Sequence, residues 1–209
     1  MFIRGLNAIY AQARGVEAAQ AKPFALFCVC LFEMLHDHHH TEENYVFPFM
    51  DAKLGTVAME HNKEQHQAFL GGLEEVDEYM KVVQAGSEVY RGEKVVEMLD
   101  RFADELVLHL HEEIDTLEAS KMRAAIPEKD LLDLNARVMK HIRSEASLTT
   151  KFPFSLICHE TASAPYFPPI PAPVLWTAKN VLYHVHSDAW AFGPCDKHGV
   201  LKPGLGNDP

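Results

Sequence analysis

Hydrophobic residues in the first two thirds of the chain recur every three or four positions, the spacing typical of amphipathic helices. Strand-like alternation is absent from this part of the sequence. On this pattern we predict five helices, at residues 1–20, 23–47, 56–85, 94–121 and 128–147. We expect the second to stop at Pro48 and the third at Gly86, because proline and glycine both interrupt helices. The sequence therefore predicts an all-α fold, an up-down four-helix bundle with a short extra helix.

The composition changes after residue 150, where eight prolines fall between Pro153 and Pro203. Prolines at this density exclude one continuous helix. The segment is nevertheless too apolar for a free tail, because it carries Phe154, Tyr166, Phe167, Trp176, Tyr183, Trp190 and Phe192. We predict two domains, a helical bundle at residues 1–147 and an irregular extension at residues 148–209 that packs on the bundle.

Charge and apolar runs narrow the classes of partner. The net charge is -11 and no run of lysine or arginine occurs, which argues against binding to nucleic acid or to an anionic membrane surface. The longest apolar run, residues 23–35, is interrupted by Glu33 and is too short to span a bilayer. The four cysteines form no CxxC pair and no signal-peptide pattern precedes them. We expect a cytoplasmic protein with reduced thiols.

Histidine is the unusual residue, with 13 copies and a dense cluster at residues 36–40. On the second helix, His38 and Glu42 continue the apolar stripe of Leu31 and Leu35. A histidine continues the inward stripe of two further helices, and on the second of these a glutamate follows four residues later. These residues are His66, His109 and Glu113. Imidazole and carboxylate four residues apart on a helix lie one above the other, so both can reach the same ion.

Several carboxylates inside one bundle are costly unless they are paired or bind a cation. A metal held by His38, Glu42, His66, His109 and Glu113 removes that cost, and nitrogen with oxygen ligands suits iron, manganese or zinc. No cysteine is suitably placed for a structural zinc site. The alternative is a set of core polar residues that satisfy one another.

Neighbouring polar residues mostly fall off these inward stripes. We expect them to be solvated or to orient the ligands by hydrogen bonds. They are His39, His40, Glu43, His111, Glu112 and Asp115. Tyr45 lies about one turn beyond Glu42 and could donate a hydrogen bond to a bound oxygen species, to a bridging carboxylate or to another buried partner.

The ordered spacing of these residues resembles the hemerythrin-like, or HHE, signature over residues 1–120. The motifs are His38-x3-Glu42-Glu43, Phe47-Pro48, Glu64-Gln65-His66 and His109-x3-Glu113. The resemblance implies a four-helix bundle with a carboxylate-bridged diiron centre, in which the histidines are terminal ligands and Glu42 and Glu113 bridge. The segments at residues 3–10 and 190–196 are also similar to fungal members.

Two departures from the family pattern concern the ligands. Members usually carry a histidine on the first helix, whereas this sequence offers none before His36. Hemerythrins proper pair two histidines four residues apart on the third helix, but the residue four before His66 is Asn62. We therefore expect a ligand position to be empty and one iron to be under-coordinated, or only one ion to bind.

Three hypotheses follow for function. The first is a diiron protein that binds or activates dioxygen, as an oxygen or iron handling protein or as an oxidase or oxygenase acting on a small molecule. The second is a regulatory module without turnover, whose fold responds to iron or redox state. The third is a scaffold with a degenerate site. The sequence specifies no substrate and does not decide whether the protein is an enzyme.

Overall fold

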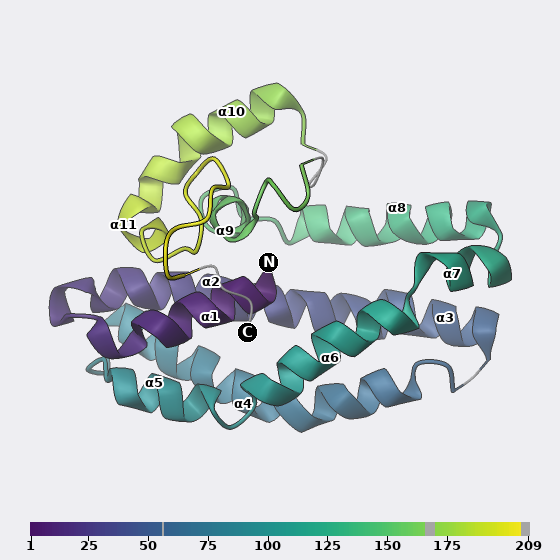
Figure 1. Cartoon of the computed structure of the whole chain (residues 1–209), viewed down its shortest axis with the longest axis horizontal. Helices are drawn as coiled ribbons and strands as arrows, with labels where there is room; N and C mark the ends of the chain where they lie inside the picture. Colours follow the sequence, from purple (N-terminus) through teal and green to yellow (C-terminus); the bar gives the residue numbers. More distant parts are fainter. Residues whose placement is uncertain (56, 166–169, 206–209) are drawn as a thin grey trace. The chain divides into compact units, whose positions relative to one another are not determined.

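A computed structural model describes residues 1–55, 57–165 and 170–205 (Figure 1). Within these ranges the chain forms helices and turns, and the only strand-like pairing is an isolated antiparallel bridge between Cys195 and Leu201. The all-α prediction is confirmed, and the up-down order of four helices stays a prediction. The predicted helix start at residue 56 and the aromatic residues Tyr166 and Phe167 lie outside the described residues.

The chain divides into two compact units, each built from separated stretches of sequence. The first unit comprises residues 1–34, 74–99 and 147–209, and the second comprises residues 35–73 and 100–146. Two long helices, α2 (Ala21–Thr41) and α4 (Glu60–Ala85), contribute to both units. The predicted domains, residues 1–147 and 148–209, stay a prediction.

The first unit packs the N-terminal helix and the C-terminal segment into one apolar core. Phe24 and Phe27 of α2 lie against Phe192 and Phe154, with ring centroids 5.0 Å and 5.2 Å apart. Besides the parts of α2 and α4, the unit contains α1 (Phe2–Gln12), α5 (Gly92–Leu99), α9 (Lys151–Cys158), α10 (Ala172–Asn180), α11 (Ser187–Trp190) and 3-10 turns at Ala13–Gly15, Ala18–Gln20 and Leu182–His186.

The C-terminal segment is more regular than we predicted, because it contains α9, α10 and α11. Three of its prolines lie where helices tolerate them. Pro153 is in the first turn of α9, while Pro171 precedes α10 and Pro173 is its second residue. The backbone N–H groups of the first turn have no partner inside the helix, so proline removes nothing there.

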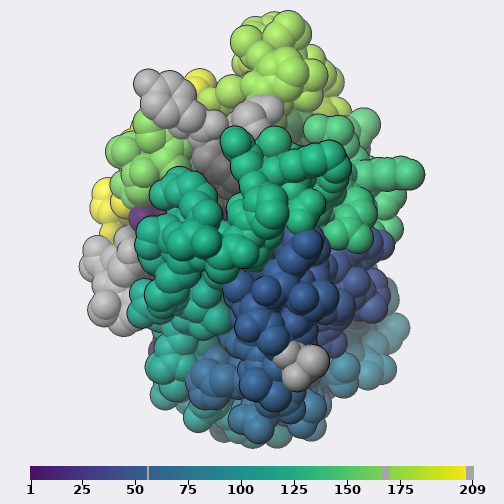
Figure 2. Space-filling model, turned by 90° about the vertical axis from the view of Figure 1, so that its right-hand side faces the viewer, coloured from purple at the N-terminus to yellow at the C-terminus, as the bar shows by residue number. Residues whose placement is uncertain are grey.

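The second unit contains the remaining parts of α2 and α4 together with α3 (Phe47–Leu54), α6 (Ala103–Thr116), α7 (Ala119–Ala125) and α8 (Glu128–Ser144). The helices α3, α7 and α8, whose outer surfaces lie on the face shown in Figure 2, contribute to a small core of Phe47, Met50, Met59, Met122, Ile126 and Leu134. An ion pair between Lys53 and Asp130, 2.6 Å long, joins α3 to α8.

The second predicted helix does not stop at Pro48, and this expectation was wrong. A five-residue π-helix, Glu42–Val46, joins α2 to α3 without a break. Phe47 N–H donates to the carbonyl of Glu42, five residues back, and Pro48 then lies in the first turn of α3. The wider turn accommodates the missing N–H of proline, so the helical path continues to Leu54.

The fourth predicted helix, residues 94–121, is interrupted at residues 100–102, between α5 and α6, and again at residues 117–118, between α6 and α7. Phe102 leaves the helical conformation, with φ -143° and ψ -16°, and its side chain is buried against Gly72 of α4. A Cβ atom at Gly72 would lie 2.8 Å from the Phe102 Cβ, so this packing requires glycine. By contrast, the third helix ends as predicted, with Gly86 at φ +80° after Ala85.

One helical stretch among the described residues, Ala18–Leu54, is long and apolar enough to cross a membrane by length and composition alone. Its most apolar window has a mean hydropathy of 1.4 and is 50% buried inside the molecule. Core helices meet the same criterion, so this finding is weak support for a membrane span.

Candidate metal centre

Six residues of the second unit bring their ligand atoms together in two overlapping groups. In each group one ligand atom per residue lies within 4.8 Å of the others. The histidine-rich group consists of His39, Glu42, His66 and His109, and the carboxylate group consists of His38, Glu42 and Glu113. Glu42 belongs to both. The five ligands that we predicted are therefore brought together, and His39 joins them.

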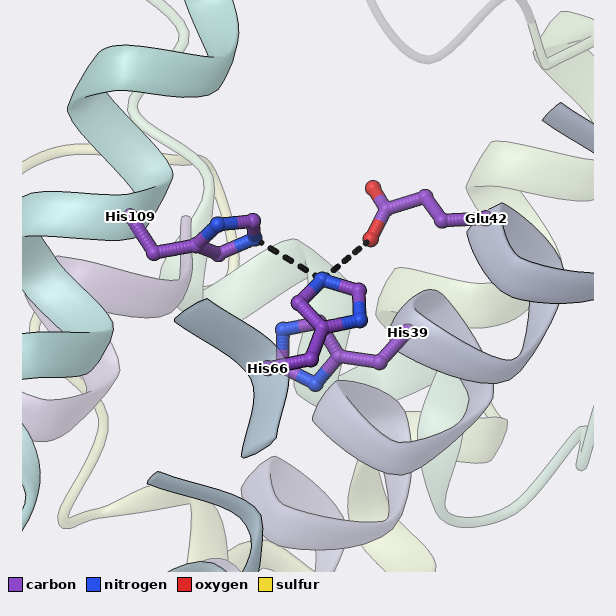
Figure 3. A group of neighbouring side chains, drawn as sticks. All are labelled: His39, Glu42, His66 and His109. Carbon is purple, nitrogen blue, oxygen red and sulfur yellow. Dashed lines mark hydrogen bonds and ion pairs between the residues drawn. The ribbon is translucent and has the colours of Figure 1, made fainter. Parts of the chain in front are cut away.

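The rings of His66 and His109 point at one another in the histidine-rich group (Figure 3). Their Nε2 atoms are 3.1 Å apart, and the Nε2 of His66 is also 3.6 Å from Oε2 of Glu42. Both rings are completely buried. Three potential ligand atoms, from the π-helix Glu42–Val46, α4 and α6, thus converge on one point.

The hydrogen bonds at the opposite ring nitrogens fix which tautomers these histidines adopt. His66 Nδ1–H donates to Oε1 of Glu43 at 2.9 Å. His109 Nδ1–H donates to Oε1 of Gln65 at 3.2 Å, and the amide of Gln65 is oriented by its own donation to Glu112 at 2.6 Å. In the neutral rings, which their lowered pKa values favour, both Nε2 atoms therefore carry lone pairs and no proton. Two lone pairs 3.1 Å apart repel each other, and a cation between them removes the repulsion.

Protonation of these histidines does not remove the repulsion near pH 7, because their pKa values are lowered. Burial lowers the pKa of His66, and burial with the neighbouring His66 and His38 lowers the pKa of His109 to about 4. Burial together with the surrounding histidines lowers the pKa of His39 to about 2. These rings are neutral near pH 7, the form in which imidazole binds metals.

The carboxylate group shows the complementary pattern. Oε1 of Glu42 lies 3.0 Å from His38 Nε2, while Oε2 of Glu113 is 4.0 Å from the same nitrogen. Burial raises the pKa values of Glu42 and Glu113 to about 8, and the proximity of the two carboxyls contributes to the value for Glu113. Without a cation both groups tend to hold a proton at neutral pH, and a metal ion would displace it.

The remaining buried polar atoms also fit a cation. Among the described residues, no hydrogen-bond partner is present for either ring nitrogen of His39, for Oε2 of Glu42 or for Oε1 of Glu113. Such atoms cost free energy unless something satisfies them. The donor set is four imidazoles and two carboxylates without thiolate, which suits iron, manganese or zinc.

His39 was not predicted as a ligand. It was expected to be solvated or to orient the ligands by hydrogen bonds. Its side chain is 2% exposed and its ring lies against the rings of His66 and Phe69 at 4.6 Å and 4.9 Å. A stripe centred on the fully buried Leu35 places His39 only about 40° away around the helix. Its Leu35-x3-His39 spacing was the available signal.

Several expected neighbours of the ligands do orient them. Glu43 is 44% exposed and accepts a hydrogen bond from His66, which is the orienting alternative of the two expected for these residues. Glu112 is linked to Gln65 and, at 3.2 Å, to His61 on the surface. His111 and Asp115 are exposed, and His40 is exposed beside Asn44. Tyr45 stacks on His141 of α8, with centroids 5.1 Å apart.

The fold and the site together define the class of protein as a metal-binding helical domain. Residues 1–120 match the family described as the hemerythrin HHE cation-binding domain, and the chain belongs to this family. The resemblance predicted from the ligand spacing is thereby confirmed.

A curated relative covers nearly the whole chain. It is named dimeric xanthone biosynthesis cluster protein and comes from Cryptosporiopsis sp. (strain 8999). The two are 32% identical over 204 residues, which is 95% of this chain and 76% of the relative. The similarity therefore includes the C-terminal segment as well as the metal-binding part. No solved structure matches the chain.

Proposed function

We propose that the second unit holds two iron ions bridged by Glu42 and that this centre binds or activates dioxygen. The observation that carries the proposal is the convergence of the Nε2 atoms of His66 and His109, 3.1 Å apart, beside a carboxylate shared by two ligand groups. A shared carboxylate can give one oxygen to each ion. The manganese and zinc alternatives are outcomes of the test.

The two groups would play different roles. His39, His66 and His109 would hold one ion in a fully buried environment, whereas the ion beside Glu113 would face His38, whose side chain is 30% exposed. When bound, a ferrous pair supplies electrons to dioxygen. Glu43 and Gln65 would keep His66 and His109 in the tautomers that present Nε2 to the ion.

The class of substrate that we propose rests only on the similarity to the Cryptosporiopsis relative. The printed name of the Cryptosporiopsis relative assigns that protein to a dimeric xanthone biosynthesis cluster. On this basis we propose that a small aromatic molecule is oxidised at the centre. The free, buried state of all four cysteines supports our further proposal of a reducing, cytoplasmic environment.

The test begins with the metal content of the purified full chain. Anaerobic loading with ferrous iron should give about two irons per chain, and admission of air should produce new near-ultraviolet absorption. His66→Ala and Glu113→Ala should each lose metal. His111→Ala provides the matched control, because His111 is an exposed histidine on α6 between two ligands.

Other outcomes separate the alternatives. Full metal content in both ligand variants would show that the ligand assignment is wrong. Metal well below one ion per chain would favour a degenerate site. Two irons that leave dioxygen and small aromatic compounds unchanged, together with a melting temperature that collapses on chelation, would favour a regulatory module.

A further inference from the structure

The helix α8 lies along the path from the π-helix Glu42–Val46 to α3 (Figure 1), and its attachment there is shallow. Of its 17 residues only Leu134 is buried, in the core cluster that contains Phe47. Near its start, Asp130 forms an ion pair with Lys53 of α3, and both side chains are about one third exposed, at 31% and 37%. Because such ion pairs add little stability, α8 can separate from the second unit at low cost.

The other end of α8 lies against a tyrosine ring. His141 stacks on Tyr45 of the π-helix, with an interplanar angle of 28° and centroids 5.1 Å apart. The ring of His40 is 5.6 Å from that of His141. Tyr45 and His141 are both partly exposed. A planar side chain stacked on a tyrosine covers the surface that a planar ligand would use.

Tyr45 is also one end of an aromatic path to the metal ligands. It belongs to the π-helix that begins with the shared ligand Glu42. Its side chain packs against the cluster that contains Phe47, and the Phe47 ring lies 5.3 Å from that of His66. Single π-helical turns are frequent at functional sites. Displacement of α8 would therefore uncover an aromatic surface next to the residues that hold the metal.

The backbone before α8 allows the helix to move as one body. Ile126 and Pro127, which separate it from α7, have extended conformations with ψ of 129° and 136°. In hinge motions a few residues at the end of an element absorb the change in dihedral angles. Rotation at Ile126 would lift α8 and leave the hydrogen bonds within the helix intact.

We propose that α8 is a lid and that a planar aromatic molecule binds to the Tyr45 ring by displacing His141. This inference rests on the proposed function for the class of its ligand. In the closed state His141 occupies the place of the ligand. In the open state the ligand stacks on the tyrosine, and α8 is released. Tyr45 is thus a substrate-positioning residue, and His141 competes with the substrate.

Fluorescence titration of the full chain with naphthol, a planar aromatic probe, tests the lid. Tyr45→Leu keeps an apolar side chain against the core and should weaken binding about three- to tenfold, the effect of losing one aromatic stack. Tyr45→Phe retains the ring and should bind as the wild type does. His141→Ala should instead bind about threefold more tightly, because the open state becomes more populated.

The ion pairs of α8 provide a matched comparison. Asp130→Asn weakens the attachment of the helix to α3 and should also tighten naphthol binding. Asp133→Asn alters an exposed pair with Lys129 inside α8 and should have no effect. Weaker or unchanged binding by both His141→Ala and Asp130→Asn would overturn the lid, since α8 would then support the binding site or have no part in it.

Iron analysis of the same preparations separates this inference from the proposed function. A wild-type chain that binds two irons but no naphthol overturns the inference alone. Equal naphthol affinities for the wild type and Tyr45→Leu would also overturn it, because the probe would then bind elsewhere. A chain that binds naphthol through Tyr45 but loads no iron supports the aromatic site and overturns the proposed function.

Discussion

The two units of the chain bury cores of opposite character. In the first, Phe24, Phe27, Phe154 and Trp190 are fully buried among other apolar side chains. In the second, the interior around α2, α4 and α6 contains three buried histidines and two buried glutamates. Burial of aromatic surface stabilises a fold unaided, whereas buried carboxylates and converging lone pairs require a partner. We therefore expect a bound ion to stabilise the second unit more than the first.

Removing the metal should have the largest effect on stability. It should destabilise the second unit and leave the first unit folded. An ion at roughly a thousandfold above its Kd adds about 4 kcal/mol to the free energy of unfolding of the unit that binds it. Chelation should therefore abolish amide protection at residues 35–73 and 100–146, while residues 1–34 retain theirs. Hydrogen exchange with and without chelator measures this, and equal loss in both units would break the comparison.

Removing a large side chain from the apolar core of the first unit should lower stability without changing metal binding. Phe24→Ala should lower the free energy of unfolding by about 3–5 kcal/mol, since it removes a fully buried ring that contacts Tyr90 and Phe192. The iron content of the folded protein should not change. Denaturant unfolding and metal analysis measure the two effects, with the exposed Val89→Ala as control. A variant that folds but loads no iron would contradict the separation of roles.

A smaller effect is expected from Glu43, which holds the His66 ring by a 2.9 Å hydrogen bond. Glu43→Ala should weaken metal affinity about 10- to 100-fold, typical of residues that orient a ligand. Competition with a chelator of known affinity would measure this. Glu64→Ala removes another exposed glutamate close to His66 and should have no such effect. Equal affinities for both variants would show that the Glu43 contact has no role in binding.

The smallest predicted effect is the number of protons that the site releases when a metal ion binds. Because the pKa values of Glu42 and Glu113 are raised to about 8, the metal-free site binds about two more protons at pH 7 than the loaded site. The protonated carboxyls stabilise the metal-free fold below their ordinary pKa, and this contribution is lost as pH rises toward 8.

Calorimetry with manganese(II) in buffers of different ionisation enthalpy can count these protons. More protons should be released at pH 7 than at about pH 8.5, where the carboxyls are already partly ionised. Release that does not change between these pH values would show that the two carboxyls are ionised before the metal binds.

Helical periodicity predicted much of this structure, and its failures have identifiable causes. The end of α4 at Gly86 is local chemistry, so it was predictable. The interruption at Phe102 was not, because it depends on the close approach of Gly72, a residue 30 positions earlier in the sequence. The prolines after residue 150 were noticed, but the places of Pro153 and Pro173 within first turns depend on where each helix begins.

The site illustrates the same limit. His66, His109 and Glu113 continue long apolar stripes on α4 and α6, so their inward position followed from spacing. His39 did not, because the stripe was drawn through His38, which lies at the edge of the buried face and is 30% exposed. The hydrogen bonds that select the His66 and His109 tautomers join different helices, and no single-helix pattern contains them.

The π-helix at Glu42–Val46 shifts the angular position, around the helix axis, of the residues that follow it. In an uninterrupted α-helix, Phe47 would lie about 140° around the axis from Glu42. The wider turn restores them to nearly one face, and both indeed approach the His66 ring, Phe47 at 5.3 Å between centroids and Glu42 at 3.6 Å. A ligand followed five residues later by an inward aromatic is therefore a signature of one inserted residue, and sequence alignments of such proteins should admit a single-residue gap there.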